Sequence, residues 1–380
     1  MSDRLREVRP SATVAMSTRA RELRRAGRDV VALSAGQPDF PTPAHVCEAA
    51  IDAMARGETG YTNLTGTPEL KSAIAESFRR ESGLVFGEEE IIVSPGGKSV
   101  IAAAWLASLS PGDEVVVPTP CWTSYPDMVR LCGGVPVPVA GGADFKMGPE
   151  ALERAITGRT RWVVLNSPGN PTGAVYSAGE LEALAEVLRR HPHVWVLSDD
   201  IYSAVTFGVP FATLAAVAPD LRDRVLVVNG VSKSYSMTGW RVGWGAGPEA
   251  LVRLMATVQG QTTTCAPSVS QAASVAALLG PQGYLRDWRR SYRRRRDLVV
   301  EGLNALPGIA CPVPEGAFYA FFRLPEGVDD VAWCARLLEE RGVALVPGAA
   351  FQAPGYVRLS YAAGEGELRE ALSRMEGFTP

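Results

Sequence analysis

Short apolar runs that alternate with helical patterns constrain the fold of this chain most strongly. Such runs lie at residues 114–118, 161–165 and 194–198, and a helical pattern at residues 178–190 separates the last two. This alternation indicates a mainly parallel sheet covered by helices on both faces. From about residue 303 the elements become shorter, which indicates a smaller second domain that the amino-terminal segment joins. We therefore predict an α/β fold with a large and a small domain.

Composition and charge narrow the possible functions. At 380 residues the chain can bury a large core, and its formal net charge of −3 gives no reason to expect a nucleic-acid partner. The 6 cysteines lack CxxC spacing and the 3 histidines form no metal-binding pattern, so we expect no metal site and no disulfide framework. The amino end is charged without an apolar signal core, and no apolar run is long enough to span a bilayer. We therefore expect a cytoplasmic protein without a membrane partner.

The segment at residues 229–241, NGVSKSYSMTGWR, places one lysine among small hydroxyl and glycine residues. The apolar run 225–228 leads into it, so we expect Lys233 just past a strand end, on a loop packed around a ligand. A buried lysine amine loses its charge readily, and a neutral amine can form a Schiff base. Arg241 has a two-pronged guanidinium that suits a phosphate. A surface lysine, or a glycine-rich loop of another α/β enzyme, would give the same pattern, so this motif alone does not establish a pyridoxal-phosphate site.

Three polar residues upstream complete the set that pyridoxal phosphate would need. Asp199 and Tyr202 follow one apolar run, and Asn170 follows another. A carboxylate keeps the pyridine nitrogen of this cofactor protonated, and a hydroxyl or an amide can bond its ring oxygen. Taken singly, Asp199 could cap a helix and Asn170 could form a turn. Because ligands of open α/β sheets gather beyond the carboxyl ends of the strands, we expect these residues to lie near Lys233.

Several segments together make the chain resemble a known family. They lie at residues 34–40 (SAGQPDF), 96–98 (GGK), 111–115 (PGDEV), 166–173 (NSPGNPTG), 198–202 (SDDIY) and 232–243 (SKSYSMTGWRVG). The chain is similar to the class I pyridoxal-phosphate aminotransferases, most of all to the bacterial branch of aspartate and aspartate/prephenate aminotransferases. The resemblance implies the α/β fold called fold type I. It also implies three segments: an amino-terminal part of the small domain (1–30), a large cofactor-binding domain (31–294) and a small carboxy-terminal domain (295–380).

The resemblance implies a role for each matched residue around the cofactor ring. Lys233 would carry pyridoxal 5'-phosphate covalently and then move the proton between the substrate Cα and the cofactor. Asp199 would pair with the pyridinium nitrogen, while Tyr202 and Asn170 would contact the ring oxygen. Trp122 matches the aromatic residue that stacks on the ring, although a tryptophan after a strand often packs in an ordinary core.

The phosphate of the cofactor would be held by residues from several segments. Gly97 and Lys98 match the turn whose N–H groups meet the phosphate at a helix N-terminus, and Arg241 completes this site. Tyr61 matches a tyrosine that reaches the phosphate of the neighbouring subunit, so the resemblance implies a homodimer with shared active sites. Some relatives have a serine in place of Gly230, and this chain lacks that phosphate contact.

The substrate would be held on the other side of the cofactor. Arg358 matches the arginine that binds the α-carboxylate; without the resemblance it would pass for an exposed position on a strand. Gly36 matches the glycine whose backbone lies beside the same carboxylate, and Trp122 and Asn170 would also line the substrate position. Arg9 stands where the branch usually has a lysine that meets the distal carboxylate of a dicarboxylic substrate.

The resemblance implies ping-pong transamination, and we expect L-aspartate with 2-oxoglutarate. Because arginine and lysine differ in reach and geometry, Arg9 bears on the choice of aspartate as substrate more than on transamination itself. Prephenate, aromatic, neutral or specialised amino acids, or another pyridoxal-phosphate reaction, stay open, because a fold does not fix the reaction. We do not expect the non-enzymatic alternative, a ligand sensor fused to a DNA-binding module, because this sequence shows no such module before residue 16 and the lysine is present.

Overall fold

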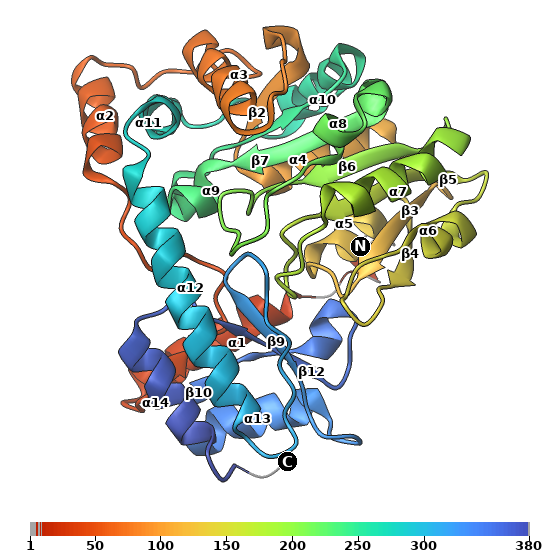
Figure 1. Ribbon diagram of the computed structural model, residues 1–380. Coiled ribbons are helices and arrows are strands. Elements are labelled where there is room, and N and C mark those ends of the chain that lie inside the picture. The colour runs from red at the N-terminus through yellow and green to blue at the C-terminus, as the bar shows by residue number, and fades with distance from the viewer. Residues whose placement is uncertain (1–4, 7, 9, 379–380) are drawn as a thin grey trace.

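The computed structural model describes residues 5–6, 8 and 10–378. A seven-stranded sheet lies at the centre of the larger body in Figure 1, with the strand order β2-β8-β7-β6-β5-β3-β4. Strands β4, β3, β5, β6 and β7 are parallel, whereas β8 runs antiparallel to both of its neighbours. The predicted mainly parallel α/β sheet is therefore confirmed. In chain order the strands are β2 (Ile91–Ser94), β3 (Glu114–Thr119), β4 (Val135–Ala140), β5 (Thr160–Asn166), β6 (Trp195–Asp199), β7 (Val225–Gly230) and β8 (Gly243–Ala246).

Helices cover both faces of this sheet because its strands are apolar on both sides. In β5, Val163 and Leu165 belong to one hydrophobic cluster, while Trp162 and Val164 belong to another. Successive side chains of a strand point to opposite faces, so each face needs its own layer of helices. The helices of this body are α2 (Ala44–Ala55), α3 (Pro68–Ser82), α4 (Gly97–Ser108), α5 (Ser124–Leu131), α6 (Pro149–Ala155), α7 (Ala178–Arg190), α8 (Leu214–Val217), α9 (Val231–Ser234), α10 (Glu249–Thr262) and α11 (Ser268–Leu279).

A smaller body contains two short sheets. Strand β1 (Val31–Ala32) pairs in parallel with β10 (Val343–Ala344). An antiparallel sheet is formed by β11 (Val346–Pro347), β12 (Tyr356–Ser360) and β9 (Tyr319–Arg323). Helices α1 (Ala12–Arg25), α13 (Asp330–Arg341) and α14 (Glu365–Met375) pack around these sheets.

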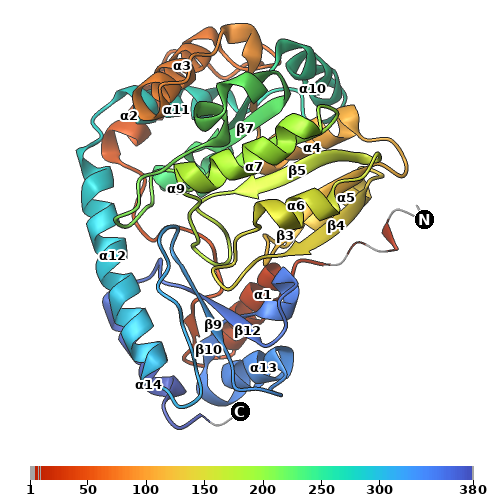
Figure 2. The same ribbon diagram turned by 45° about the vertical axis from the view of Figure 1, so that its right-hand side comes forward.

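Both ends of the chain contribute to the smaller body. In Figures 1 and 2 the red helix α1 lies among the blue elements of the carboxyl end, and it contacts β10 and β11. The long helix α12 (Gly283–Asn304) runs along both bodies. The domain limit that we predict at residue 294 falls inside this helix, and the limits of the three segments stay predictions.

Two negative findings apply to the residues that the structure describes. No helix among them is both long and apolar enough to cross a membrane. Their histidine, cysteine and acidic side chains form no group of three or more that could hold a metal ion.

Candidate active site

A cavity of about 320 Å³ opens at the carboxyl ends of the parallel strands, and residues of both bodies line it. Its volume suits a small-molecule site, and its position is the usual one for a ligand of an open α/β sheet. Most of the residues predicted from the sequence line it. They are Gly36, Gly97, Lys98, Trp122, Asn170, Asp199, Tyr202, Lys233, Arg241 and Arg358.

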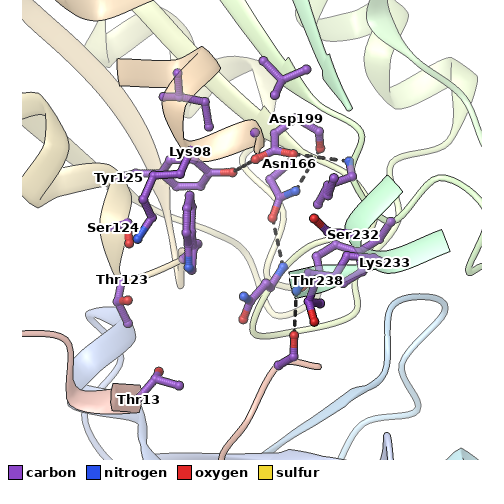
Figure 3. Close-up of a pocket in the computed structure, with 18 of the residues that line it drawn as sticks. Thr13, Lys98, Thr123, Ser124, Tyr125, Asn166, Asp199, Ser232, Lys233 and Thr238 are labelled. Atoms are coloured by element: carbon purple, nitrogen blue, oxygen red, sulfur yellow. Dashed lines mark hydrogen bonds between the residues drawn. The ribbon is translucent and has the colours of Figure 1, made fainter. Parts of the chain in front are cut away.

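Lys233 enters the cavity from the short helix α9, directly after β7. Its Nζ donates a hydrogen bond of 2.6 Å to the backbone oxygen of Gly36, as Figure 3 shows. Desolvation, with a smaller effect of the positive charges of Arg358 and Arg241, lowers the pKa of Lys233 to about 8. The amine is therefore neutral more often than that of an exposed lysine, and a neutral amine is the nucleophilic and basic form.

Asp199 ends strand β6 and is only 5% exposed. The hydroxyl of Tyr125 donates a 2.6 Å hydrogen bond to its Oδ2, and the N–H of Ile201 donates to its Oδ1 at 3.3 Å. Burial raises the pKa of Asp199 to about 6, although the bond from Tyr125 opposes this effect. A carboxylate held in this way at a cavity wall can pair with a protonated nitrogen of a ligand.

Arg358 lies on β12 and is 2% exposed, so it is not the exposed strand position that its alternating pattern suggests. Its Nη1 donates to Oδ1 of Asn170 at 2.8 Å and its Nη2 to the backbone oxygen of Ser34 at 2.7 Å. Its Nε has no hydrogen-bond partner in the described structure. The guanidinium carbon lies 4.5 Å from the ring centre of Tyr319 and 4.9 Å from that of Phe351. Its described contacts include no carboxylate.

The hydroxyls of Tyr202 and Tyr319 lie 2.7 Å apart and join the two bodies at the cavity floor. Tyr319 also lies close to Gly36, since a Cβ at Gly36 would come within 2.4 Å of the Tyr319 hydroxyl oxygen. A glycine is required here for that close approach. Gly36, Tyr202 and Arg358 thus meet around a single tyrosine ring.

The opposite end of the cavity is shaped by glycines at the start of α4. Gly96 has a φ of +90°, and a Cβ there would come within 2.3 Å of Arg241 Nη2. Arg241 lies against this turn and donates to the backbone oxygens of Thr238 at 2.9 Å and Pro95 at 3.2 Å. The N–H groups at the start of α4, together with Arg241, make this end suitable for an anion. Lys98 lies beside it, with its Nζ 4.9 Å from the ring centre of Trp122.

The structure also accounts for the glycine where some relatives have a serine. A Cβ at Gly230 would come within 2.9 Å of the backbone oxygen of Val242. A serine therefore does not fit this backbone without a shift. The hydroxyl-bearing residues Ser232 and Thr238 line the cavity nearby.

One predicted residue, Tyr61, does not lie in this cavity. Tyr61 is 91% exposed and is absent from the cavity wall. Arg9 lies outside the described residues. The neighbouring residues Ser11, Thr13 and Val14 do line the cavity.

The sequence analysis missed three side chains that organise the site, namely Tyr125, Tyr319 and Asn166. Asn166 donates from Nδ2 to the backbone oxygen of Asp199 at 2.9 Å and accepts from the N–H of Asn170 at 3.0 Å, which ties two strand ends together. Its position at the start of the NSPGNPTG segment was an available signal. Tyr125 follows Trp122 by three residues, a spacing that places both side chains on one side of a helical turn. No sequence pattern marks Tyr319.

A family model for aminotransferases of class I and II matches residues 28–375. The chain belongs to this family. Enzymes of this family depend on pyridoxal phosphate, and the cavity of this aminotransferase fits that cofactor. Lys233 offers an amine, buried Asp199 offers a carboxylate to the ring nitrogen, and the ring of Trp122 offers a flat wall. At the other end of the cavity Gly96 has no side chain, and a Cβ there would take the place of Arg241. Arg241 and the N–H groups at the start of α4 are therefore the groups that would hold the phosphate.

Characterised aminotransferases are similar to this one over nearly its whole length. The aspartate aminotransferase of Rhizobium meliloti (strain 1021) is 52% identical over 98% of this chain and 95% of its own length. The aspartate/prephenate aminotransferase of Cereibacter sphaeroides is 50% identical over 100% of this chain and 98% of its own length.

Solved structures share the fold. The crystal structure of the Rhizobium meliloti aspartate aminotransferase has a TM-score of 0.95 at 51% identity, and the match covers 99% of this chain and 97% of that one. The aspartate aminotransferase of Thermus thermophilus with maleate also has a TM-score of 0.95, at 46% identity, with 100% and 99% of the two chains covered. The predicted family and its α/β fold are confirmed.

Proposed function

We propose that this aminotransferase moves the amino group of L-aspartate to 2-oxoglutarate. The state of Arg358 carries this proposal. It is a buried guanidinium whose described acceptors are neutral and whose Nε lacks a partner. An unpaired buried charge is costly, so an anion is expected beside it, and the α-carboxylate of an amino acid fits a planar guanidinium. Relatives about half identical in sequence carry the names aspartate aminotransferase and aspartate/prephenate aminotransferase, which supports aspartate as the amino donor.

Each residue of the site has a defined task in this proposal. The bound cofactor supplies an electron sink for the negative charge that develops on the substrate Cα. Arg358 binds the α-carboxylate and thereby turns the Cα–H bond toward Lys233. Lys233 removes this proton as a general base, and its pKa of about 8 keeps part of the amine neutral at physiological pH. Asp199 holds the proton on the ring nitrogen through its negative charge, and Tyr125 orients that carboxylate.

The proposal places both substrates in one site, one after the other. The amino acid leaves as its oxo acid before the second oxo acid enters, so both must bind to Arg358. Among the described residues, Ser11 and Thr13 lie on the cavity wall next to the chain segment that carries Arg9. This position supports a role for Arg9 at the distal carboxylate of a dicarboxylic substrate.

The proposal includes a homodimer in which Tyr61 of one copy serves the site of the other. The side chain of Tyr61 is 91% exposed, whereas the neighbouring residues Thr62 and Leu64 are held by hydrogen bonds. Gln271 donates to the hydroxyl of Thr62 at 2.8 Å, and Gln259 donates to the backbone oxygen of Leu64 at 2.6 Å. Tyrosine is enriched at protein interfaces, so this exposed side chain supports the proposed contact with a partner. The cytoplasmic location stays a prediction from the sequence.

The first test is an absorbance spectrum of the purified protein after addition of pyridoxal phosphate. We expect a band of bound cofactor that L-aspartate changes and 2-oxoglutarate restores. Lys233→Ala should abolish the reversible change, because no amine remains to hold the cofactor and move the proton. If L-aspartate leaves the band unchanged while prephenate with another amino donor turns over, the cofactor site stands and the proposed substrate pair does not. If no band forms, the assignment of Lys233 is wrong.

A further inference from the structure

The loop between β4 and α6, residues 141–147, touches both bodies of the protein. It is closed on itself: the N–H of Gly142 donates to the backbone oxygen of Lys146, and the N–H of Phe145 donates to the backbone oxygen of Gly142, both at 2.9 Å. Asp144 Oδ1 accepts from the N–H of Lys146 at 3.2 Å. The two residues at the end of this closed loop, Phe145 and Lys146, point to different partners.

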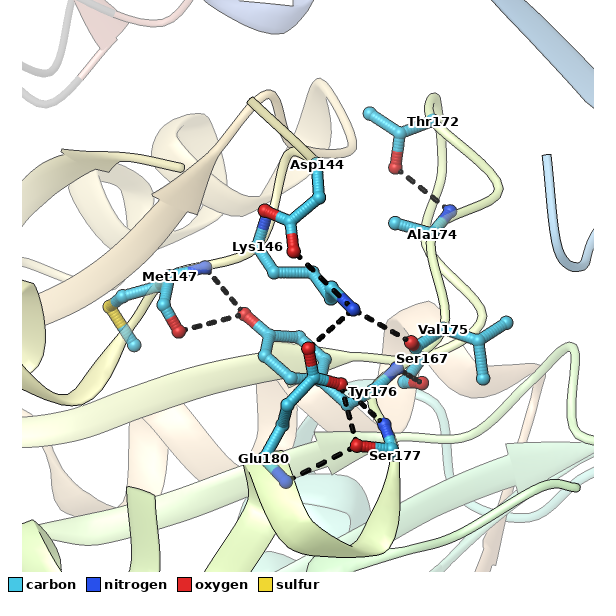
Figure 4. Close-up of polar contacts among 10 residues, drawn as sticks. All are labelled: Asp144, Lys146, Met147, Ser167, Thr172, Ala174, Val175, Tyr176, Ser177 and Glu180. Atoms are coloured by element: carbon cyan, nitrogen blue, oxygen red, sulfur yellow. Dashed lines mark hydrogen bonds and ion pairs between the residues drawn. The ribbon is translucent and has the colours of Figure 1, made fainter. Parts of the chain in front are cut away.

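Lys146 ties the loop to the segment that carries Asn170. Its Nζ lies 2.5 Å from Glu180 Oε1 and 3.4 Å from Asp144 Oδ2, and it donates to the backbone oxygen of Val175 at 3.5 Å (Figure 4). The next residue, Met147, donates its N–H to the hydroxyl of Tyr176 at 2.7 Å. The loop is therefore fixed to the chain that returns from the NSPGNPTG turn.

Phe145 faces the other way, toward the smaller body. Its ring centre lies 5.6 Å from those of Phe321 on β9 and Tyr356 on β12, in edge-to-face geometry. Phe321 is in edge-to-face contact with Phe351, at 6.0 Å, and the Phe351 ring lies under the guanidinium of Arg358. A chain of aromatic contacts thus leads from the loop to the residue proposed to bind the substrate carboxylate.

The backbone of Phe145 supports a positioning task. Its φ is +63°, in the left-handed region that a bulky side chain seldom adopts. Such a conformation persists only where the surroundings compensate for it. Here the compensation comes from the ring contacts with Phe321 and Tyr356 and from the closed turn.

We propose that Phe145, held by Lys146, is a positioning residue that sets the place of Arg358 relative to Asn170 and Lys233. This inference rests on the proposed function, because it assigns Arg358 to the α-carboxylate. Lys146 and Phe145 act in series. Lys146 fixes the loop to the larger body, and Phe145 holds the strand that carries Arg358 against this loop. The cofactor contacts of Lys233, Asp199 and Arg241 do not pass through the loop.

The test compares Phe145→Ala with the wild-type holoenzyme. We expect the KM for L-aspartate and for 2-oxoglutarate to rise together by about tenfold or more, because a misplacement of about 1 Å caused by a distant mutation can cost up to about a hundredfold. The dissociation constant of pyridoxal phosphate should stay unchanged. Succinate, which has carboxylates but no amino group, should protect the variant less than the wild type against thermal unfolding. Phe145→Leu, which keeps an apolar side chain, should restore most of the affinity.

A matched control is Phe378→Ala. Phe378 is also half-buried and in edge contact with an aromatic ring, Trp333 at 5.5 Å, but at the far side of the smaller body. Its replacement should lower stability without changing either KM. An unchanged KM in both Phe145 variants, or an equal rise in Phe378→Ala, would overturn the inference. Wild-type protein that binds no cofactor and moves no amino group would instead refute the proposed function.

A separate experiment tests whether the contacts of Lys146 and Phe145 act in series. Lys146→Met should raise both KM values in the same direction, and the double variant with Phe145→Ala should be no worse than Phe145→Ala alone, because contacts in series are not additive. Lys71→Met is the control, since Lys71 Nζ also donates to a backbone oxygen, that of Glu88 at 2.9 Å, away from the cavity. Additive effects of the two replacements would contradict the series arrangement.

Discussion

At the scale of single residues, the burial of charged groups is the main free-energy cost of this site. Lys233, Asp199 and Arg358 all lose water on folding, and each pKa moves in the direction that disfavours the charged form. In Lys233 the lowered pKa yields a reactive amine. In Arg358 the same effect leaves a cation that gains most from a bound carboxylate. Stability is therefore lost where function needs these groups.

Asp199 provides the first prediction. Its native pKa is about 6 against the usual 3.8, so folding favours the protonated carboxyl; this stabilisation is complete below pH 3.8 and is lost as the pH rises through 6. The shift of about two units corresponds to about 3 kcal/mol. Asp199→Asn should therefore stabilise the cofactor-free protein at pH 7 by up to about 3 kcal/mol in urea unfolding. In the holoenzyme it should lower kcat by at least about a hundredfold, because the charge beside the ring nitrogen is gone. If the variant is instead less stable than the wild type, the hydrogen bond from Tyr125 stabilises the protein by more than burial of the carboxylate destabilises it.

The neighbouring Asp200 should give the same pH dependence of stability as Asp199, but its replacement should not affect activity. Burial raises its pKa to about 8, and Ser198 donates to it at 2.9 Å, away from the cavity wall. At pH 7 this carboxyl is mostly protonated, so an amide resembles its native state. Asp200→Asn should retain kcat and change the free energy of unfolding at pH 6.5 by less than about 1 kcal/mol. Between pH 4 and 8 the wild type should lose stability relative to this variant. A large loss of kcat would mean that Asp200 has a role at the cofactor.

The strand-end residues could be predicted from the sequence, whereas their partners could not. Asp199, Asn170 and Lys233 follow apolar runs in the chain, and parallel topology then brings them to one edge of the sheet. The contact of Arg358 with Asn170 joins residues 188 positions apart, and no local pattern contains it. The sequence did not predict the burial of Arg358 for the same reason. An alternating strand shows which residues share a face but not what covers that face.

At the scale of elements, local sequence patterns predict some bounds and miss others. The pattern at 178–190 coincides with α7, which a capping box between Ser177 and Glu180 begins. The mainly apolar run at 317–323 is longer than its strand, because Ala317 has a φ of +56° and β9 begins only at Tyr319. The short apolar run at 343–346 is divided between two strands, β10 and β11, which belong to different sheets. Pairing partners distant in sequence decide such a division.

The contact between β8 and the start of α4 gives the third prediction. A Cβ at Gly243, the first residue of β8, would come within 2.3 Å of the backbone nitrogen of Gly97. Gly243→Ala should push the helix start out of place and weaken pyridoxal-phosphate binding by at least about tenfold, which corresponds to about 1.4 kcal/mol. Equilibrium dialysis against the cofactor measures this change. Gly179→Ala is the control, because no atom lies within 4 Å of that Cβ. Equal affinities in both variants would show that the turn adapts without cost.

At the scale of the whole molecule, segments far apart in the chain must fold together before a site exists. Helix α1 and strand β12 come from opposite ends, and both contribute to the cavity wall through Thr13 and Arg358. The exposed Tyr61 extends this dependence to a second chain in our proposal. Sequence patterns could predict the two bodies, but the closure between them depends on contacts such as Tyr202 with Tyr319.

Subunit mixing tests the shared site. Lys233→Ala subunits should be inactive, and Tyr61→Ala subunits should be active only at high cofactor concentration. If each site combines Lys233 of one subunit with Tyr61 of the other, about half of the randomly re-formed dimers contain one complete site. Activity at low pyridoxal phosphate should then rise above the mean of the unmixed samples. Mixing Tyr61→Ala with the double variant Lys233→Ala/Tyr61→Ala supplies no intact Tyr61 and should give no rise. If the first mixture also gives none although the subunits exchange, Tyr61 does not serve the neighbouring site.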